Sequence, residues 1–319
     1  MPRPTHLSLA LMLATFAAAP AALAQAYPTK PVTIVVGYPA GGSTDLTGRT
    51  LGDALAKQLG VPVVIENLGG AGGAIGAQKV ASAAPDGYTL LVGANNEVAI
   101  SKLVTKTTRY DLKDFTPIGL IASQPMVLVA SPTAGVKNLD EFLAKVKAAP
   151  GKFSYGSSGV GTALHLAGEM VKERAGLFMT HIPYRGVAPL TTDLVGGNLD
   201  YGVFVLSSGL PHIKSGKVVA LGTTEAKRSP LTADIPALGE HKALKGIDIG
   251  SWFVLMGPAR LPDAVVARLK TALAESLKSP DFRKKMEASG STVAAPGGDI
   301  GPFLQAEVAK YQTIVQVAK

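Results

Sequence analysis

The sequence predicts an α/β protein of two lobes, each a doubly wound sheet with helices on both faces. Short β-branched runs alternate with longer amphipathic stretches, and the alternation restarts in the middle of the chain. Such alternation is typical of parallel sheets with right-handed crossovers. The chain has 319 residues, 47% of them hydrophobic and 17% charged, which excludes a disordered protein and provides for a large core.

The N-terminal 24 residues have the pattern of a signal peptide. Arg3 and His6 precede an apolar run over residues 7–23, and Ala-Leu-Ala at residues 22–24 is a typical cleavage site. A membrane anchor is the alternative, but the run is short and rich in Ala and contains Pro20. The chain has no cysteine, which excludes disulfides, thiolate metal sites and a lipid-modified N-terminal cysteine. We therefore expect an exported protein without a lipid anchor.

The mature chain begins with a β-α-β-α-β unit. Strands are expected at residues 32–36, 63–65 and 89–92, where β-branched residues cluster. A glycine-rich turn at residues 39–42 precedes a helix over residues 44–59, which Thr44 or Ser43 would cap. A second glycine-rich loop at residues 69–73 precedes a helix that continues to residue 84.

The alternation then restarts and gives a second unit. Strands are expected at residues 126–130, 152–155, 180–184, 201–206 and 218–222, and helices at 139–148, 162–174 and 190–194. The last third adds a strand at 252–256, a helix over 262–288 that Ser279-Pro280 breaks, and a helix over 299–317. Crossovers near residues 121–126 and 222–229 would place residues 25–123 and 223–319 in lobe 1 and residues 124–222 in lobe 2.

The charge gives a weak indication of the binding partner. A formal net charge of +8 and a pI near 9.5 are compatible with nucleic-acid binding. However, the basic residues are scattered, and the densest cluster, residues 283–285, lies in an expected surface helix. We therefore expect no nucleic-acid partner, and interpret the charge as an aid to solubility with a weak attraction for anions.

Two glycine-rich segments, residues 38–45 (YPAGGSTD) and 155–162 (YGSSGVGT), each join an expected strand to an expected helix. Glycines leave backbone N–H groups uncovered, and a helix N-terminus carries a partial positive charge, so an anion could bind at each. A tight turn capped by Thr44 or Asp45 is the alternative for the first segment. If the two lobes face each other, both helix starts would converge on one ligand.

Signatures of catalysis are incomplete. The dinucleotide fingerprint that begins at Gly70 and Gly72 has Ile75 where its third glycine belongs. The segment Gly156-Ser-Ser-Gly159 lacks the order of a nucleophile elbow. His165 and Glu169, four residues apart on a helix, have no third metal ligand nearby. We therefore expect no catalytic residue, no metal and no cofactor, and a function of binding without chemistry.

Several segments together resemble the Bug family, also called the TctC family, the periplasmic solute-binding proteins of tripartite tricarboxylate transporters. They are residues 27–36 (YPTKPVTIVV) with 39–45, 110–117 (YDLKDFTP), 155–159, 183–186 (PYRG) and 227–230 (KRSP). The resemblance implies a type II, Venus-flytrap periplasmic binding protein that closes on a small organic carboxylate. This ligand would be a mono- or dicarboxylate, an aromatic acid or an amino acid. The receptor, a monomer, would deliver it to the membrane permease subunits of the transporter.

The resemblance also implies a binding site. In that family the loops matching residues 38–45 and 157–162 hold one carboxylate through backbone N–H groups and hydroxyls, and the loop matching residues 93–97 supplies side chains for the other end of the ligand. Arg185 either lies beside the cleft or is structural. The expected ligand-binding residues are Tyr38, Pro39, Ala40, Gly41, Gly42, Thr44, Asp45, Asn95, Asn96, Glu97, Ser157, Ser158, Gly159, Gly161, Thr162, His165, Tyr184 and Asp200.

Glu97 departs from the small hydroxyl residues that are usual in its loop. If it faces the cleft, its charge would oppose a second ligand carboxylate; alternatively, it caps the following helix and faces solvent. Two other functions stay open on the residues alone. A closed receptor could dock on a two-component kinase as a sensor, or Ser157 or Ser158 with His165 could serve a secreted hydrolase.

Overall fold

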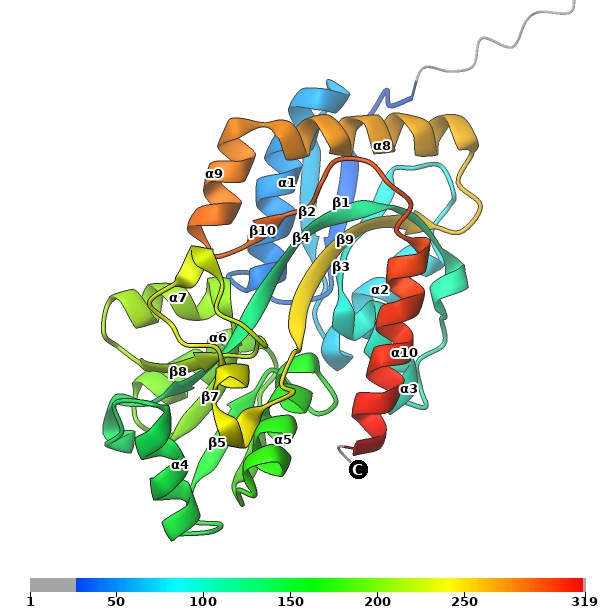
Figure 1. Ribbon diagram of the computed structural model, residues 1–319. Helices are drawn as coiled ribbons and strands as arrows, with labels where there is room; N and C mark the ends of the chain where they lie inside the picture. The colour runs from blue at the N-terminus through cyan, green and yellow to red at the C-terminus, as the bar shows by residue number, and fades with distance from the viewer. Residues whose placement is uncertain (1–26, 318–319) are drawn as a thin grey trace, which may run out of the picture.

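Strand β4 (Phe115–Ala130) runs through both lobes of the molecule and belongs to both of its sheets (Figure 1). A computed structural model describes residues 27–317. The sheet of the first lobe has the order β2-β1-β3-β9-β4, and that of the second continues β4-β7-β5-β6, with β8 also paired to β4. The expected signal peptide, residues 1–24, lies outside the described residues.

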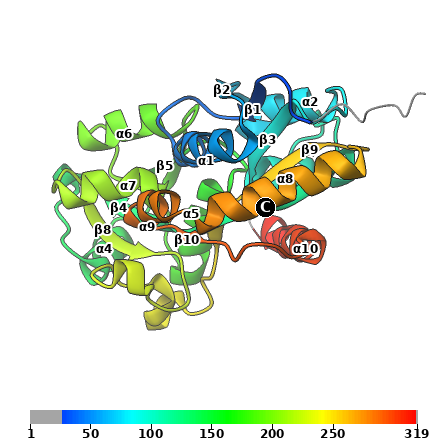
Figure 2. The same cartoon turned by 90° about the horizontal axis from the view of Figure 1, so that it is seen from above.

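The first-lobe sheet consists of β1 (Val32–Val36), β2 (Val63–Asn67), β3 (Thr89–Ala94), β9 (Gly250–Pro258) and the first part of β4, with the short strand β10 (Thr292–Val293) paired to β4. Its helices are α1 (Ser43–Leu59), α2 (Ala74–Ala81), α3 (Ser101–Val104), α8 (Asp263–Lys278), α9 (Pro280–Ala288) and α10 (Gly301–Val317). Figure 2 shows α1 beside α8, and these two helices pack against each other. Helix α10 packs against α3 and the preceding π-helical turn η2 (Asn96–Ile100).

The second-lobe sheet consists of β5 (Ser154–Ser157), β6 (Thr180–Pro183), β7 (Tyr201–Val205), β8 (Val219–Thr223) and the last part of β4. Helices α4 (Leu139–Ala148), α5 (Ala163–Ala175), α6 (Val187–Val195) and α7 (Leu206–Lys214) cover it. Its core contains the fully buried rings of Phe142 and Tyr201, which meet edge to face with centroids 4.7 Å apart. The expected α/β architecture with helices on both faces is confirmed.

The parallel pairing that the alternation predicts holds for part of each sheet, and the central strands make both sheets mixed. Strands β1, β2 and β3 are parallel to one another, as are β5, β6 and β7, but β9 runs antiparallel to β3 and β4. Strand β4 also runs antiparallel to β7 and β8. The chain crosses from the first lobe along β4 and returns along β9, and two neighbouring strands that cross in opposite directions are antiparallel.

Two further elements differ from expectation. Strand β4 begins at Phe115, eleven residues before the expected start at 126, because its first part pairs with β9. Helix α7 was not expected at all, since Pro211 lies inside it and proline normally disfavours a helix interior. The break at Ser279-Pro280 was confirmed, because α8 ends at Lys278 and α9 begins at Pro280.

The residue boundaries of the lobes stay a prediction. The partner of β4 changes from β9 to β7 and β8 between Pro125 and Met126. Between β8 and β9 the chain forms short helical turns, one of which, Lys242–Leu244, contacts α5 of the second lobe. Within residues 27–317, no helix combines the length and apolar character that a membrane crossing requires.

Candidate functional site

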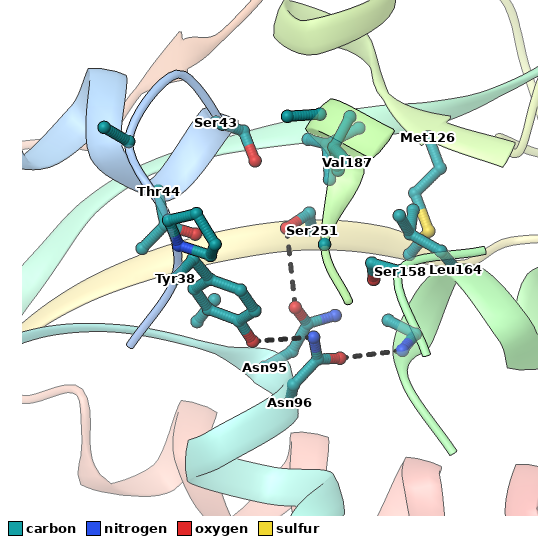
Figure 3. A pocket seen from close by; sticks show the side chains of 18 residues that line it. Tyr38, Ser43, Thr44, Asn95, Asn96, Met126, Ser158, Leu164, Val187 and Ser251 are labelled. Carbon is teal, nitrogen blue, oxygen red and sulfur yellow. Dashed lines mark hydrogen bonds between the residues drawn. The ribbon is translucent and has the colours of Figure 1, made fainter. Parts of the chain in front are cut away.

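A cavity lies where the two lobes meet, and we call it the inner cavity (Figure 3). The space between its lining atoms is about 570 Å³, which includes the solvent at its opening. It is bounded by segments after β1, β3, β5 and β6, by the end of β7, and by the central strands β4 and β9. None of its lining side chains is charged. They are Tyr38, Pro39, Ala40, Gly42, Ser43, Thr44, Ala94, Asn95, Asn96, Met126, Ser158, Ala163, Leu164, Gly186, Val187, Ala188, Val205 and Ser251.

Helix α1 begins at this cavity without a side-chain cap. The loop after β1 turns through Gly41, whose φ of +90° favours glycine, and the helix starts at Ser43. Ser43 and Thr44 are buried and line the cavity. The first-turn amides of a helix have no intrahelical acceptor and carry a partial positive charge. The start of α1 is therefore suited to bind an anionic group in the cavity.

Asp45 shapes this loop without lining the inner cavity. Its carboxylate accepts hydrogen bonds from Gly41 N (2.9 Å), Arg49 Nε (3.0 Å) and Asn67 Nδ2 (2.8 Å). Burial raises the pKa of Asp45, but the hydrogen bonds from Arg49, Gly41 and Asn67 outweigh burial and hold the pKa below its ordinary value. The Asp45 carboxylate thus has its hydrogen-bond donors within the protein. It fixes the backbone that leads into α1.

The start of α5 differs from that of α1, because side chains of the protein itself already accept hydrogen bonds from its first amides. The Oγ1 atom of Thr162 caps the helix and accepts from His165 N at 3.4 Å. The amide of Ala163 donates to Asn96 Oδ1 at 2.7 Å. Since Asn96 belongs to the first lobe, this bond joins the two lobes across the cavity (Figure 3). Both expected helix starts border one cavity, but only that of α1 has no side-chain cap.

A hydrogen-bonded chain continues from Asn96 into the first lobe. Asn96 Nδ2 donates to the hydroxyl oxygen of Tyr38 at 2.8 Å. The Tyr38 hydroxyl lies 2.7 Å from Glu97 Oε2 and 2.9 Å from Gly72 O, two acceptors for a single proton. Burial raises the pKa of Glu97 to about 7, although the hydrogen bonds that its carboxylate accepts from Tyr38 and from Ala94 N act to lower it.

Glu97 lies behind Tyr38 and is only 1% exposed. The alternative in which it faces solvent was therefore wrong. Its other oxygen accepts from Ala94 N at 2.9 Å, and it is not among the residues that line the inner cavity. Any influence of Glu97 on a ligand would act through Tyr38.

Asn95 lines the inner cavity, but other parts of the protein already use its amide. Asn95 Nδ2 donates to the Tyr311 hydroxyl of α10 at 2.6 Å and to Gly250 O at 3.1 Å. Its Oδ1 accepts from Ser251 Oγ at 3.4 Å. Because both amide hydrogens are directed at protein acceptors, Asn95 has none left for a ligand.

A larger hollow, the outer cavity, adjoins the inner cavity and shares with it Tyr38, Pro39, Asn96, Ser158 and Gly186. Four of the expected site residues line only this outer cavity, namely Gly159, Gly161, Thr162 and Tyr184. The glycine-rich loop after β2 and Arg185 also line it. Tyr184 donates to Asp193 Oδ2 at 2.8 Å.

Ser157 and His165 hold the glycine-rich segment of residues 155–162 in place. Ser157 is fully buried, with its Oγ 2.7 Å from His181 Nε2. His165 accepts from Gly161 N at 3.0 Å and stacks on His181 with ring centroids 4.0 Å apart. Burial and, to a smaller extent, the nearby His165 together lower the pKa of His181 to about 4. Ser158 donates to Thr162, so the serine–His165 pairs considered for a hydrolase are not formed.

Asp200 lies away from both cavities. It precedes β7, whereas the inner cavity is bordered by Val205 at the other end of that strand. Its carboxylate accepts from Ser154 N (2.8 Å) and Ser154 Oγ (3.0 Å), which ties β5 to β7. The structure does not bring Asp200 together with the other expected site residues.

Sequence reasoning missed much of the inner cavity wall. Met126 and Val205 lie in strands, and Leu164 and Val187 lie in the first turns of helices, where apolar residues normally indicate core. Ser251, on the returning strand β9, carries no motif. Of the lining residues that were not among the expected ligand-binding residues, Ser43 had a signal as a possible cap of α1, and Ala94 and Gly186 lie in the segments 93–97 and 183–186 that the resemblance singled out.

Comparisons with known proteins agree with this architecture. The family described as "Tripartite tricarboxylate transporter family receptor" matches residues 47–319. BugT of Bordetella pertussis is 31% identical over 312 residues, which cover 97% of this chain and 95% of BugT.

Two solved structures are also similar to this chain in sequence and in fold. An R. palustris protein solved with adipate is 31% identical, with a TM-score of 0.87 over 92% of this chain and 98% of that one. MatC from Rhodopseudomonas palustris, solved with bound malate, is 31% identical, with a TM-score of 0.84 over 91% of this chain and all of that chain (100%).

The buried Glu97 predicts a pH dependence of stability. Its pKa is about 7 in the folded protein against 4.5 for a free side chain, so folding favours the protonated carboxyl. The stabilisation is complete below the unfolded pKa and is lost as the pH rises from 4.5 to 7. Urea unfolding across this range should show the wild type losing on the order of 3 kcal/mol relative to Glu97→Gln. Glu173→Gln, an exposed change on α5, controls for the loss of one carboxylate, and parallel pH profiles for wild type and Glu97→Gln would contradict the assignment.

Proposed function

The chain belongs to the tripartite tricarboxylate transporter receptor family, TctC, and from this we propose that it is a periplasmic receptor for a small organic carboxylate. The ligand would bind in the inner cavity between the lobes. The receptor would then deliver it, as a monomer, to the membrane permease subunits of a tripartite transporter.

The observation that carries this proposal is the uncapped, buried start of α1 at the inner cavity. A carboxylate oxygen is a strong acceptor, and it would satisfy amides that the helix itself leaves unpaired. No lining side chain is charged, so the backbone and hydroxyls would supply the contacts. Ser43 and Thr44 are hydroxyl residues at this end of the cavity, and Ser158 and Ser251 line other parts of it.

The relatives support a carboxylate as the ligand class. The R. palustris protein was solved with adipate and MatC with malate, both of which are dicarboxylates. Those two proteins share the fold of this chain over more than nine-tenths of its length, with 92% and 91% covered. The signal-peptide pattern of residues 1–24 supports export to the periplasm.

Carboxylate binding should stabilise the folded protein. A ligand at a hundredfold excess over its dissociation constant stabilises by about 2.7 kcal/mol. Differential scanning fluorimetry with a panel of mono- and dicarboxylates, on protein unfolded and refolded to remove any bound compound, should show a raised melting temperature with at least one of them. If the refolded protein is native by circular dichroism and no carboxylate shifts its melting temperature, the proposal fails.

The start of α1 should matter more for binding than its end. Gly41, before α1, and Gly60, after it, have φ values of +90° and +75°, and a Cβ added at either meets no atom within 4 Å. Alanine at either position should therefore cost about 1 kcal/mol of stability through backbone strain alone. Only Gly41→Ala should also weaken carboxylate binding, by at least about fivefold, because it shifts the amides at the cavity.

Isothermal titration calorimetry on both variants, with the best carboxylate of the panel, makes this comparison. Equal affinities for Gly41→Ala and Gly60→Ala would show that the α1 amides do not hold the ligand.

A further inference from the structure

A hydrogen bond between a side chain and the backbone joins the two lobes at the inner cavity. Asn96 Oδ1, from the first lobe, accepts from Ala163 N, the first amide of α5 in the second lobe, at 2.7 Å (Figure 3). Asn96 is 9% exposed and Ala163 is 3% exposed, so both partners are shielded from bulk water. The bond therefore lies in surroundings where an unpaired amide would be costly.

The Asn96 amide can take only one orientation in this place. Its Nδ2 donates to the Tyr38 hydroxyl oxygen at 2.8 Å, and its Oδ1 faces the N–H of Ala163, which can only donate. A flipped amide would set two donors against each other. The Tyr38 hydroxyl is itself within hydrogen-bond distance of Glu97 Oε2 and Gly72 O. Tyr38 thus directs the acceptor of Asn96 towards the second lobe.

The lobes also touch at other points around the two cavities. A Cβ added to Gly161 of the second lobe would lie only 2.7 Å from the side chain of Val104 on α3. A Cβ added to Gly186, before α6, would lie 3.5 Å from Pro39 in the loop before α1. The structure therefore has its lobes in contact, which is the arrangement that lets Asn96 reach Ala163.

Separation of the lobes would change the surroundings of the Ala163 amide. In an open form, water would bind both Asn96 and the amide, so the net value of the bond between them is modest. In the closed form, an amide that has lost Asn96 would stay buried without an acceptor, which costs more than the net value of the bond. Loss of the Asn96 side chain would therefore penalise the closed form and not the open form.

We propose that Asn96 holds the two lobes together in the closed form, and that Tyr38 is a positioning residue that orients Asn96 for this bond. Because both partners belong to the protein, the bond also forms in ligand-free protein and keeps it closed. The inference goes beyond the proposed function, since it concerns the protein alone and can be tested without a ligand.

Asn96→Ala and Asn95→Ala form a matched pair for the test. Asn95 is the neighbouring residue and lines the same cavity, but its amide bonds to Tyr311, Gly250 and Ser251, all in the first lobe. Small-angle X-ray scattering on refolded, ligand-free protein should give a larger radius of gyration for Asn96→Ala than for the wild type. Asn95→Ala should lower the melting temperature but keep the wild-type radius.

Ala163→Pro removes the same bond from the other side. Proline has no N–H and is favoured at the first position of a helix, and Thr162 before it has a ψ of 161°, the extended conformation that precedes proline. The proline ring would also displace Asn96 from its present position. The radius of gyration should rise as in Asn96→Ala, and the two changes together should raise it no further than either alone.

Tyr38→Phe tests the positioning role, because it keeps the ring and removes the oxygen that accepts from Asn96 Nδ2. It should raise the radius of gyration in the wild-type background. In the Asn96→Ala background it should change nothing, whereas a purely structural loss would add to the effect of Asn96→Ala.

Affinity provides a second readout once a carboxylate ligand is known. Closure then costs more in Asn96→Ala, so calorimetry should show binding weakened by about fivefold relative to the wild type.

The outcomes separate this inference from the proposed function. Equal radii of gyration for wild type, Asn96→Ala and Ala163→Pro, all native by circular dichroism, would overturn the role of Asn96 and leave the carboxylate receptor intact. An Asn95→Ala radius as large as that of Asn96→Ala would also overturn it. If Asn96→Ala does not fold, Ala163→Pro decides in its place. Opening of the variants without binding of any carboxylate would overturn the proposed function alone.

Discussion

The amides at the start of a buried helix must find acceptors, and the inner cavity is organised around this requirement. Two glycine loops bring the starts of α1 and α5 to one place from opposite lobes. At α5 the protein supplies the acceptors itself, from Thr162 and from Asn96 of the other lobe. At α1 it supplies no side-chain cap, and it places an uncharged cavity there. The start of α1 is therefore available to an anionic group, and the start of α6 at Gly186, which also lines the cavity, has no side-chain cap either.

The bonds that occupy the cavity amides also connect distant parts of the chain. Through Asn96 and Tyr38, the start of α5 in the second lobe is linked to the buried carboxyl of Glu97 in the first. Through Asn95, the cavity is linked to Tyr311 near the C-terminus. The contact between the lobes and the protonation of Glu97 therefore share a hydrogen-bonded chain, although neither Glu97 nor Tyr311 lines the inner cavity.

Local signals predicted the secondary structure well wherever neighbours in the sequence decide it. Helix α1 follows its glycine turn as expected, and Pro280 separates α8 from α9. Prediction failed where partners lie far along the chain. The first part of β4 is a strand because β9, from the last third of the sequence, pairs with it, and that pairing also makes the sheet mixed. The family resemblance, carried by short motifs in order, was confirmed.

The sequence by itself determined that glycine loops precede two helices and that an α/β core forms, and it predicted an anion site near residues 38–45 and 157–162. Only the tertiary structure decided which of these groups remain available to a ligand. Asp45, Ser157 and His165 support the loops, and Glu97 lies behind Tyr38. Whether a polar group is free depends on its hydrogen-bond partner, and for Asn95 that partner, Tyr311, lies 216 residues away. Whether an apolar residue such as Met126 lines a cavity or a core depends on what the other lobe places opposite it, and no local pattern of residues encodes that.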